Sequence, residues 1–195
     1  MQIIKIVTSV TVEHLKQKAR KLKREKGILH TQALDEIAKS DGFEQWYQVV
    51  EANSRIKPAE VALSSGCVMA FDVKDGMDID TSHGVLNEDP YLEMLTEAQL
   101  FDVYANLPDE YDELNRTLKE TLSDMELREF FESDFSFMFF RLNETHSQKS
   151  LEEVLKLIQQ YAFWMPHYVW LQGNLIDTYN RPVEDSEGNI AGVRF

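Results

Sequence analysis

The sequence predicts an α+β protein that is predominantly helical. Apolar residues recur at spacings of three and four over most of the chain as far as Tyr161, and short β-branched or aromatic runs follow. Charge then divides the chain. Residues 1–58 carry 11 Lys and Arg against 7 Asp and Glu, a net charge of +4, whereas residues 59–195 carry 9 against 27, a net charge of −18. We therefore expect a basic three-helix module over residues 1–57 and a larger acidic helical domain with a small antiparallel sheet over residues 58–195.

The N-terminal module is expected to contain three helices after a short strand or extended arm over residues 2–10. Thr11 can cap the first helix, because a threonine oxygen accepts a hydrogen bond from a free N–H of the first turn. Gly27 can end that helix, since glycine readily adopts the left-handed conformation of a C-cap. Helical spacing predicts a second helix over 30–39 and a third over 43–53. The expected core comprises Leu22, Leu34, Ile37, Phe43, Trp46 and Val50.

The acidic domain is expected to begin with a β-hairpin. Proline, glycine and polar residues at 57–58 and 64–66 predict a linker or loop. The run 67–73 then suits a strand, and a Lys-Asp-Gly turn follows it over 74–76. Such a turn favours a hairpin whose second strand lies over 77–80.

The remainder predicts helices first and strands afterwards. A capping box at Thr96 can divide the first helical stretch, and Pro108 occupies a favourable first helical position. The aromatic run 135–140 must be buried. Ser150 with Glu153 forms a capping box that opens an amphipathic helix. The expected elements are helices over 91–105, 108–125 and 151–161, and strands over 168–171, 175–179 and 190–195.

One stretch of the module resembles a known sequence pattern. The pattern is His-x-Gln-Ala-Leu-x-x-Ile-Ala followed by Gly-Phe-x-x-Trp, within residues 15–50. It resembles a short helical module of uncharacterised bacterial proteins, many encoded on mobile elements and some labelled glyoxalase-related. The resemblance implies a bacterial or mobile-element origin and no particular activity, and it does not extend to residues 60–195. The matching residues are Leu15, Ala19, Leu22, His30, Gln32, Ala33, Leu34, Ile37, Ala38, Gly42, Phe43 and Trp46.

The first helix carries the main candidate for a binding surface. Seven cationic side chains fall within eleven positions, and such a patch can neutralise several anionic groups. Acidic residues on the next two helices, among them Asp35 and Glu44, oppose phosphate, so we expect nucleic-acid binding to be weak. Two alternatives stay open: the cations solvate an exposed helix face, or they dock on the acidic domain of the same chain. The five residues expected to bind a macromolecule are Lys16, Arg20, Lys21, Lys23 and Arg24.

Carboxylates near the first strand offer an alternative function. Asp72, Asp75, Asp78 and Asp80 form the densest short acidic segment with strand flanks, and carboxylates are the preferred ligands of Mg²⁺. They could serve a divalent-metal-dependent enzyme that acts on nucleic acid. The segment lacks the spacing of a calcium loop, and we expect it to be a surface turn. We therefore predict no metal, no cofactor and no catalytic residue.

Three further features have structural explanations. The five histidines include no pair at metal-ligand spacing, and His30 is expected to cap or pack at the start of its helix. Cys67 has no basic neighbour nearer than Lys74 and is expected to be an inert core thiol. The aromatic segment 163–170 fits either a buried core or an interface, where Trp and Tyr are enriched.

Together these observations predict a non-enzymatic accessory or regulatory protein. It would bind another macromolecule, with a protein as the expected partner, through charge-complementary surfaces. The sequence shows neither a membrane-spanning run nor the features of a signal peptide, so we expect a cytoplasmic protein with no membrane partner. The oligomeric state is left open.

Overall fold

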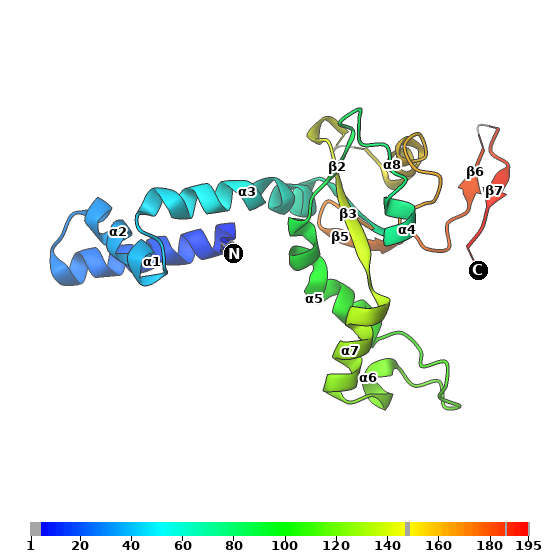
Figure 1. Cartoon of the computed structure of the whole chain (residues 1–195), viewed down its shortest axis with the longest axis horizontal. Helices are drawn as coiled ribbons and strands as arrows, with labels where there is room; N and C mark the ends of the chain where they lie inside the picture. Colours follow the sequence, from blue (N-terminus) through cyan, green and yellow to red (C-terminus); the bar gives the residue numbers. More distant parts are fainter. Residues whose placement is uncertain (1–4, 147–148, 186, 195) are drawn as a thin grey trace. The chain divides into compact units, whose positions relative to one another are not determined.

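The computed structural model describes residues 5–146, 149–185 and 187–194, and its contacts divide the chain into two compact units, Met1–Val61 and Ala62–Phe195 (Figure 1). Over the described residues the chain forms eight α-helices, a five-stranded antiparallel sheet and a separate pair of strands. The predicted α+β class with a predominance of helix is therefore confirmed.

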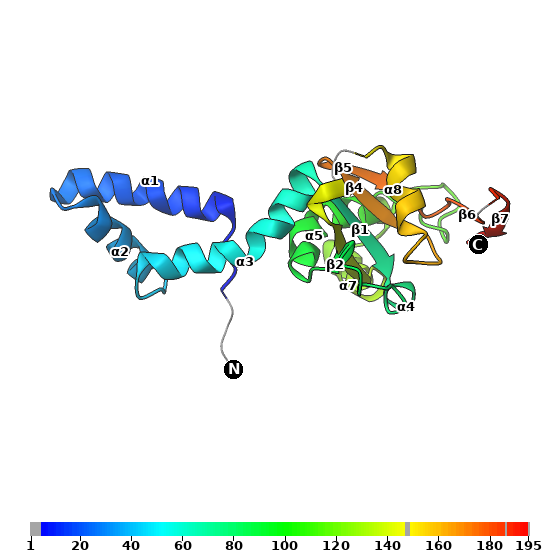
Figure 2. The same ribbon diagram turned by 90° about the horizontal axis from the view of Figure 1, so that it is seen from above.

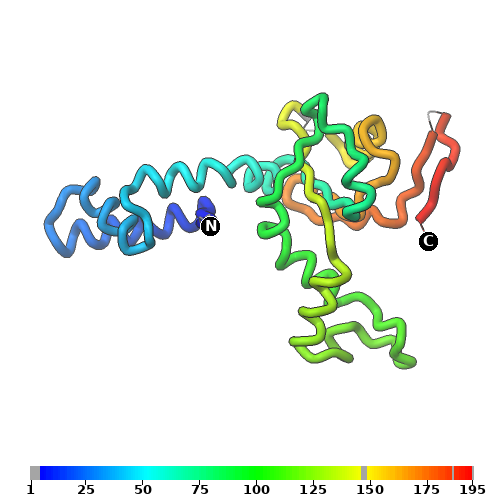
Figure 3. Tube along the Cα trace, in the orientation of Figure 1, coloured from blue at the N-terminus to red at the C-terminus, as the bar shows by residue number. Residues whose placement is uncertain are grey.

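The first unit contains α1 (Ser9–Lys26), α2 (His30–Ser40) and most of α3 (Trp46–Ser65), and the tube of Figure 3 follows the chain as it turns back after α1. Of the short strand or extended arm expected over residues 2–10, the strand is wrong, because residues 5–8 form no strand and residues 9–10 belong to α1. Residues 2–4 of that expectation lie outside the described residues.

The ends of α1 follow the rules of helix capping. Thr8, and not Thr11, is the N-cap: its hydroxyl oxygen accepts a hydrogen bond from the Thr11 backbone N–H at 3.2 Å. Gly27 ends the helix with φ +65°, as expected, and its N–H donates to the Lys23 carbonyl. This left-handed residue lets the chain turn into α2 within a few residues.

All three helices contribute to one apolar cluster. Trp46 and Ile37 pack at its edge, as expected, whereas Val50 is 48% exposed and Val49 is fully buried in its place. Successive helical residues are rotated by about 100°, so a one-residue error in the buried stripe moves a side chain to the helix flank. The buried members of the cluster are Val7, Val12, Leu15, Ala38 and Val49.

The loop expected at residues 57–58 is wrong, because Pro58 lies inside α3. Proline lacks the N–H that would donate to the carbonyl four residues earlier, so it weakens a helix and usually marks its end. Here Ile56 and Ala59, on either side of the proline, are fully buried. Burial of this apolar stripe offsets the lost hydrogen bond, and the helix continues.

The second unit is built on a five-stranded sheet in the order β2-β3-β1-β4-β5, with every pairing antiparallel (Figure 2). The central strand, β1, is buried along five of its six residues. Its neighbours come from distant parts of the sequence. The strands are β1 (Cys67–Asp72), β2 (Leu86–Glu88), β3 (Phe137–Leu142), β4 (Tyr168–Leu171) and β5 (Asn174–Asp177).

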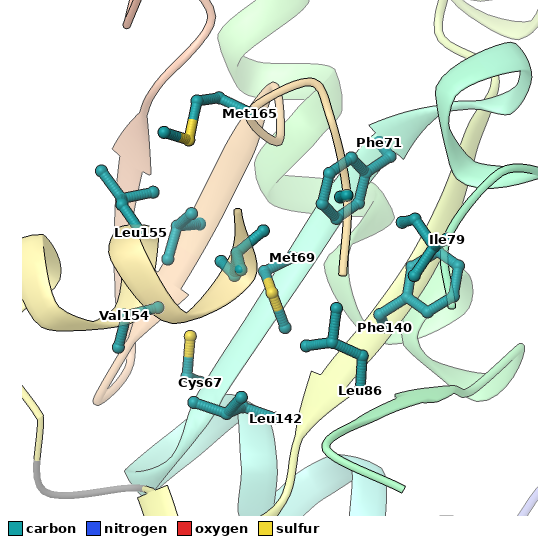
Figure 4. Packing of buried hydrophobic residues seen from close by; sticks show 13 residues of the cluster. Cys67, Met69, Phe71, Ile79, Leu86, Phe140, Leu142, Val154, Leu155 and Met165 are labelled. Carbon is teal, nitrogen blue, oxygen red and sulfur yellow. The ribbon is translucent and has the colours of Figure 1, made fainter. Parts of the chain in front are cut away.

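One face of the sheet is covered by α8 (Leu151–Ile158). Val154 and Leu155 of this helix belong to the same buried cluster as Cys67 and Met69 of β1, and Figure 4 shows Val154 beside Cys67 and Leu155 on the side of Met165. In the strand register Met69 lies opposite Phe140 on β3 and Val169 on β4, so side chains of the three central strands meet in one apolar layer. Ser150 caps α8 in a capping box, as expected.

The opposite face is aromatic. Tyr168 and Trp170 of β4 alternate with the residues that face α8, and Trp170 donates its indole N–H to Gln99 at 2.6 Å. Gln99 lies on α5 (Tyr91–Ala105), which is continuous through Thr96, so the capping box there does not divide it. Helix α7 (Asp124–Asp134) adds Phe131, whose ring packs against Tyr104 of α5. The aromatic residues of the run 135–140 are buried or half-buried, and Ser136 among them is exposed.

Two predicted elements of this unit are wrong. The chain after β1 forms one helical turn, α4 (Val73–Gly76), in place of the expected hairpin turn, because Asp72 accepts a hydrogen bond from the Lys74 N–H and caps it. The helix expected over 108–125 is a loop in which Pro108 bridges Thr117, followed by the short α6 (Leu118–Thr121).

After β5 the chain forms a separate pair of strands. These are β6 (Val183–Glu184) and β7 (Ile190–Gly192), which pair with each other and not with the main sheet. The strands expected at 168–171 and 175–179 are confirmed in β4 and β5, and that at 190–195 only as far as Gly192, with Phe195 outside the described residues.

Candidate macromolecule-binding surface

Three of the five predicted binding residues line one open hollow on the first unit. Lys23 and Arg24 lie three and four residues after Arg20, so all three project from the same side of α1. His30, the first residue of α2, completes the hollow, whose volume is about 290 Å³. The left-handed turn at Gly27 places His30 beside the last turns of α1.

The hollow retains unneutralised positive charge. Arg20 lies 3.6 Å from Glu13, and both side chains are at least half exposed, so solvent screens this pair. Lys23 and Arg24 form no ion pair with any residue of the described chain. The hollow can therefore accept an anionic group without first breaking a strong internal contact.

The other two predicted residues do not belong to this group. Lys16 lies 4.0 Å from Glu13 one turn earlier, and Lys21 lies 3.8 Å from Glu25. Neither lines the hollow. Glu13, one turn before Lys16, and Glu25, one turn after Lys21, therefore neutralise part of the positive charge of α1.

His30 was assigned the wrong role by the sequence. It is exposed and is the first helical residue of α2, whereas Leu29 occupies the N-cap position. The signal that could have placed it correctly is the glycine three residues earlier, because a left-handed cap forces a tight reversal. His30 then faces the helix that precedes it, where Lys23 and Arg24 lie.

Three of the four carboxylates of the alternative site bind different partners. Asp72 caps α4, Asp75 pairs with Arg194 at 2.5 Å, and Asp80 accepts a hydrogen bond from the Ser82 N–H. The hydrogen bond from the Ser82 hydroxyl, and next that from the Ser82 N–H, lower the pKa of Asp80. Asp78 is exposed. No group of three or more His, Cys, Asp or Glu side chains in the described part of the chain is arranged to hold a metal ion.

The remaining candidates lie in or beside the core of the second unit. Cys67 is 1% exposed, and burial raises the pKa of its thiol to about 12, so the reactive thiolate is absent at neutral pH. Most of the aromatic segment 163–170 is buried, with Trp170 fully enclosed and Phe163 61% exposed. Core packing therefore accounts for most of that segment.

No family model, curated protein or solved structure matches this chain. Among the described residues, none of the helices combines the length and apolarity needed to cross a membrane.

Proposed function

We propose that this protein is a non-enzymatic accessory or regulatory protein that binds an acidic surface of another protein through the α1 hollow. The observation that supports the proposal is the grouping of Arg20, Lys23, Arg24 and His30 around one open concavity, two of them without an ion-pair partner in the described chain. Arginine recognises carboxylates through its planar fork of N–H donors, so an Asp- or Glu-rich segment suits the site.

A protein partner is favoured over nucleic acid by the other charges of the module. Glu13, Glu25 and Glu36 pair with cations of α1, which reduces the number of phosphates the helix could neutralise. A duplex presents a continuous row of phosphates, whereas an acidic protein segment can place a few carboxylates in one hollow. The resemblance of residues 15–50 to bacterial mobile-element proteins supports a bacterial setting.

The proposal is tested by binding of a poly-glutamate peptide of about 20 residues to the full chain at several salt concentrations. The double variant Arg20→Glu/Arg24→Glu should abolish binding, because it inverts two charges inside the hollow. Its melting temperature should stay nearly unchanged, since both side chains are exposed.

The matched control is Lys16→Glu/Lys21→Glu, which makes the same charge change on the same helix outside the hollow. It should weaken binding only slightly. Equal losses in the two double variants would contradict a site at the hollow. The outcome that would instead make nucleic acid the partner is binding of a 20-base-pair duplex with a dissociation constant below about 1 μM at physiological salt. The log of that affinity should then fall with the log of the salt concentration with a slope of about −3.

A further inference from the structure

Arg194 is held in the second unit by an arrangement that resembles ligand binding. Its guanidinium carbon lies 5.4 Å from the ring centroid of Trp164 and 5.6 Å from that of Tyr179. One of its terminal nitrogens donates to Asp75 at 2.5 Å. The side chain is only 11% exposed and that of Asp75 only 20%. The contacting groups come from three separate segments: α4, the residues after α8, and the residues after β5.

The chemistry of these contacts is specific for a guanidinium group. The two aromatic rings attract a cation through their π-electrons, and partial burial strengthens this attraction. The carboxylate supplies a charge-assisted hydrogen bond, which guanidinium satisfies with a flat set of N–H donors. Lysine carries a compact, strongly hydrated charge and cannot stack on the rings in the same way.

Negative charge surrounds the same place. The ring of His167 lies 4.8 Å from that of Tyr179. His167 interacts electrostatically with the carboxylates of Asp72, Asp75 and Asp177. Arg194 is the cation that acts on this histidine in the opposite sense. Removal of Arg194 would leave the partly buried carboxylate of Asp75 without its ion-pair partner, and such a vacancy attracts another cation. The second unit as a whole has nine Lys and Arg against 26 Asp and Glu, which favours the approach of a basic segment.

The segment that carries Arg194 makes few other contacts with the sheet. Strand β7 pairs only with β6, and its first residue, Ile190, is 66% exposed. Val193, next to the arginine, is 45% exposed. Gly192 does pack against the Trp164 ring, where an added Cβ would lie 3.2 Å from a ring carbon. The Arg194 side chain is therefore the main polar attachment of this segment.

We propose that Asp75, Trp164 and Tyr179 form a guanidinium-binding site that Arg194 occupies in the free protein and that an arginine of a basic partner segment can occupy in its place. The site is called the arginine cradle below. It is independent of the α1 hollow, which lies in the other unit and selects the opposite charge. Displacement of Arg194 would release residues 187–194 from this anchor when the partner binds.

The test uses the full chain and two acetylated pentapeptides, one with a central arginine among glycines and one with a central lysine. Arg194→Ala vacates the cradle, so this variant should bind the arginine peptide at least about fivefold more tightly than the lysine peptide. The parent chain should bind the arginine peptide more weakly than the variant does, because Arg194 competes. The indole N–H resonance of Trp164 reports occupancy.

Two variants distinguish the cradle from general electrostatic attraction. Asp75→Asn combined with Arg194→Ala should lose the preference for arginine. Arg181→Ala is the matched control, because Arg181 pairs with Glu152 at 2.8 Å on the surface with both side chains more than 40% exposed. It should gain no peptide binding. If Arg194→Ala does not fold, Arg194→Lys is measured in its place and should show the same preference. No binding, or equal binding of the two peptides by the folded variant, would overturn the proposal.

Discussion

His167 is a partly buried histidine that must remain neutral in the folded chain. It precedes β4 and lies between the rings of Phe137 and Tyr179, with centroid distances of 5.4 and 4.8 Å. Burial, and next the positive charge of Arg194, lower the pKa of His167 to about 4. Nearby carboxylates act in the opposite sense without restoring the usual value. Protonation is therefore easier in the unfolded chain than in the folded one.

This difference predicts an acid-sensitive part of the stability. A histidine with an unfolded pKa of about 6.5 and a lower folded pKa contributes its full stability above about pH 6.5 and loses it as the pH falls towards 4. The free energy of unfolding of the parent should therefore decrease over this window more than that of His167→Gln. Urea titrations at pH 7, 5.5 and 4.5 measure the two slopes.

His14→Gln is the control for this experiment, because His14 is exposed on α1. Its stability should follow that of the parent at every pH. If His167→Gln and the parent lose the same free energy of unfolding between pH 7 and 4.5, burial of a neutral imidazole is not the cause of the acid sensitivity.

Single-residue burial could be predicted from the sequence only where an element begins at the expected place. The sequence predicts that the third helix begins at residue 43, whereas it begins at Trp46. As a result the sequence places Val50 in the core, whereas Val49 is the residue that is buried. In α8 the capping box fixed the first residue, and the apolar residues Val154 and Ile158 are buried as its spacing predicts. A cap sets the phase of the stripe, which periodicity alone cannot do.

At the scale of elements, the cap of α8 gives a quantitative prediction. The Ser150 hydroxyl oxygen accepts a hydrogen bond from the Glu153 N–H, and the Glu153 carboxylate accepts hydrogen bonds from the Ser150 N–H and hydroxyl. The helix covers the central strands. Ser150→Ala should lower the free energy of unfolding by about 1 kcal/mol, because one capping oxygen is lost. Ser133→Ala, at an exposed position near the end of α7, should change it by no more than a few tenths. Chemical denaturation measures both, and similar losses in the two variants would show that the cap contributes nothing.

The loop after α5 shows why a helical pattern can fail. Tyr111 and Leu114 have helical spacing but are 97% and 75% exposed, so burial of their side chains does not stabilise a helix there. The Asp109 side chain accepts a hydrogen bond from the Tyr111 N–H, and that of Asp112 accepts two further backbone N–H groups. Aspartate side chains that bind nearby backbone in this way compete with the helix. The pattern predicts an amphipathic face, but the structure provides nothing for it to pack on.

The sheet could be predicted only in part, because strand pairing is not local. The run that forms β1 was identified, as were β4 and β5, whose short connection favours a hairpin. The partners of β1 are β3, which begins 65 residues after Asp72 at Phe137, and β4. Such distant pairings leave no trace in local composition, so the nearest apolar residues were taken for the second strand.

At the scale of the whole molecule, the two units predict separate folding behaviour. A fragment of residues 1–65 contains all of α1, α2 and α3 together with the cluster around Ala38 and Val49. It should be helical alone but of low stability, because so small a domain buries little apolar surface. Far-ultraviolet circular dichroism and a thermal melt measure this, with residues 1–42, which lack α3, as the control. A random-coil spectrum of the longer fragment would contradict independent folding.

The sequence shows the charge division of the chain, but it does not show which cations of the basic helix line the hollow. Composition identifies seven cations on α1, whereas the grouping of Arg20, Lys23 and Arg24 depends on where α2 begins and on which acids lie one turn away. The arginine cradle was equally inaccessible, since Asp75, Trp164 and Arg194 are far apart in sequence. Both features depend on the three-dimensional arrangement of the chain.

Cys67 makes the opening of the second unit directly measurable. It is the one cysteine of the sequence and lies on the central strand, enclosed by residues of α8. A thiol reagent reaches Cys67 only in molecules whose sheet has opened. The observed labelling rate is therefore the reagent's rate with a free thiol multiplied by the fraction of molecules in the open state. Unfolding of the first unit alone would leave that rate unchanged. The parent chain thus contains, without any engineered probe, a reporter that separates the stability of one half of the protein from that of the other.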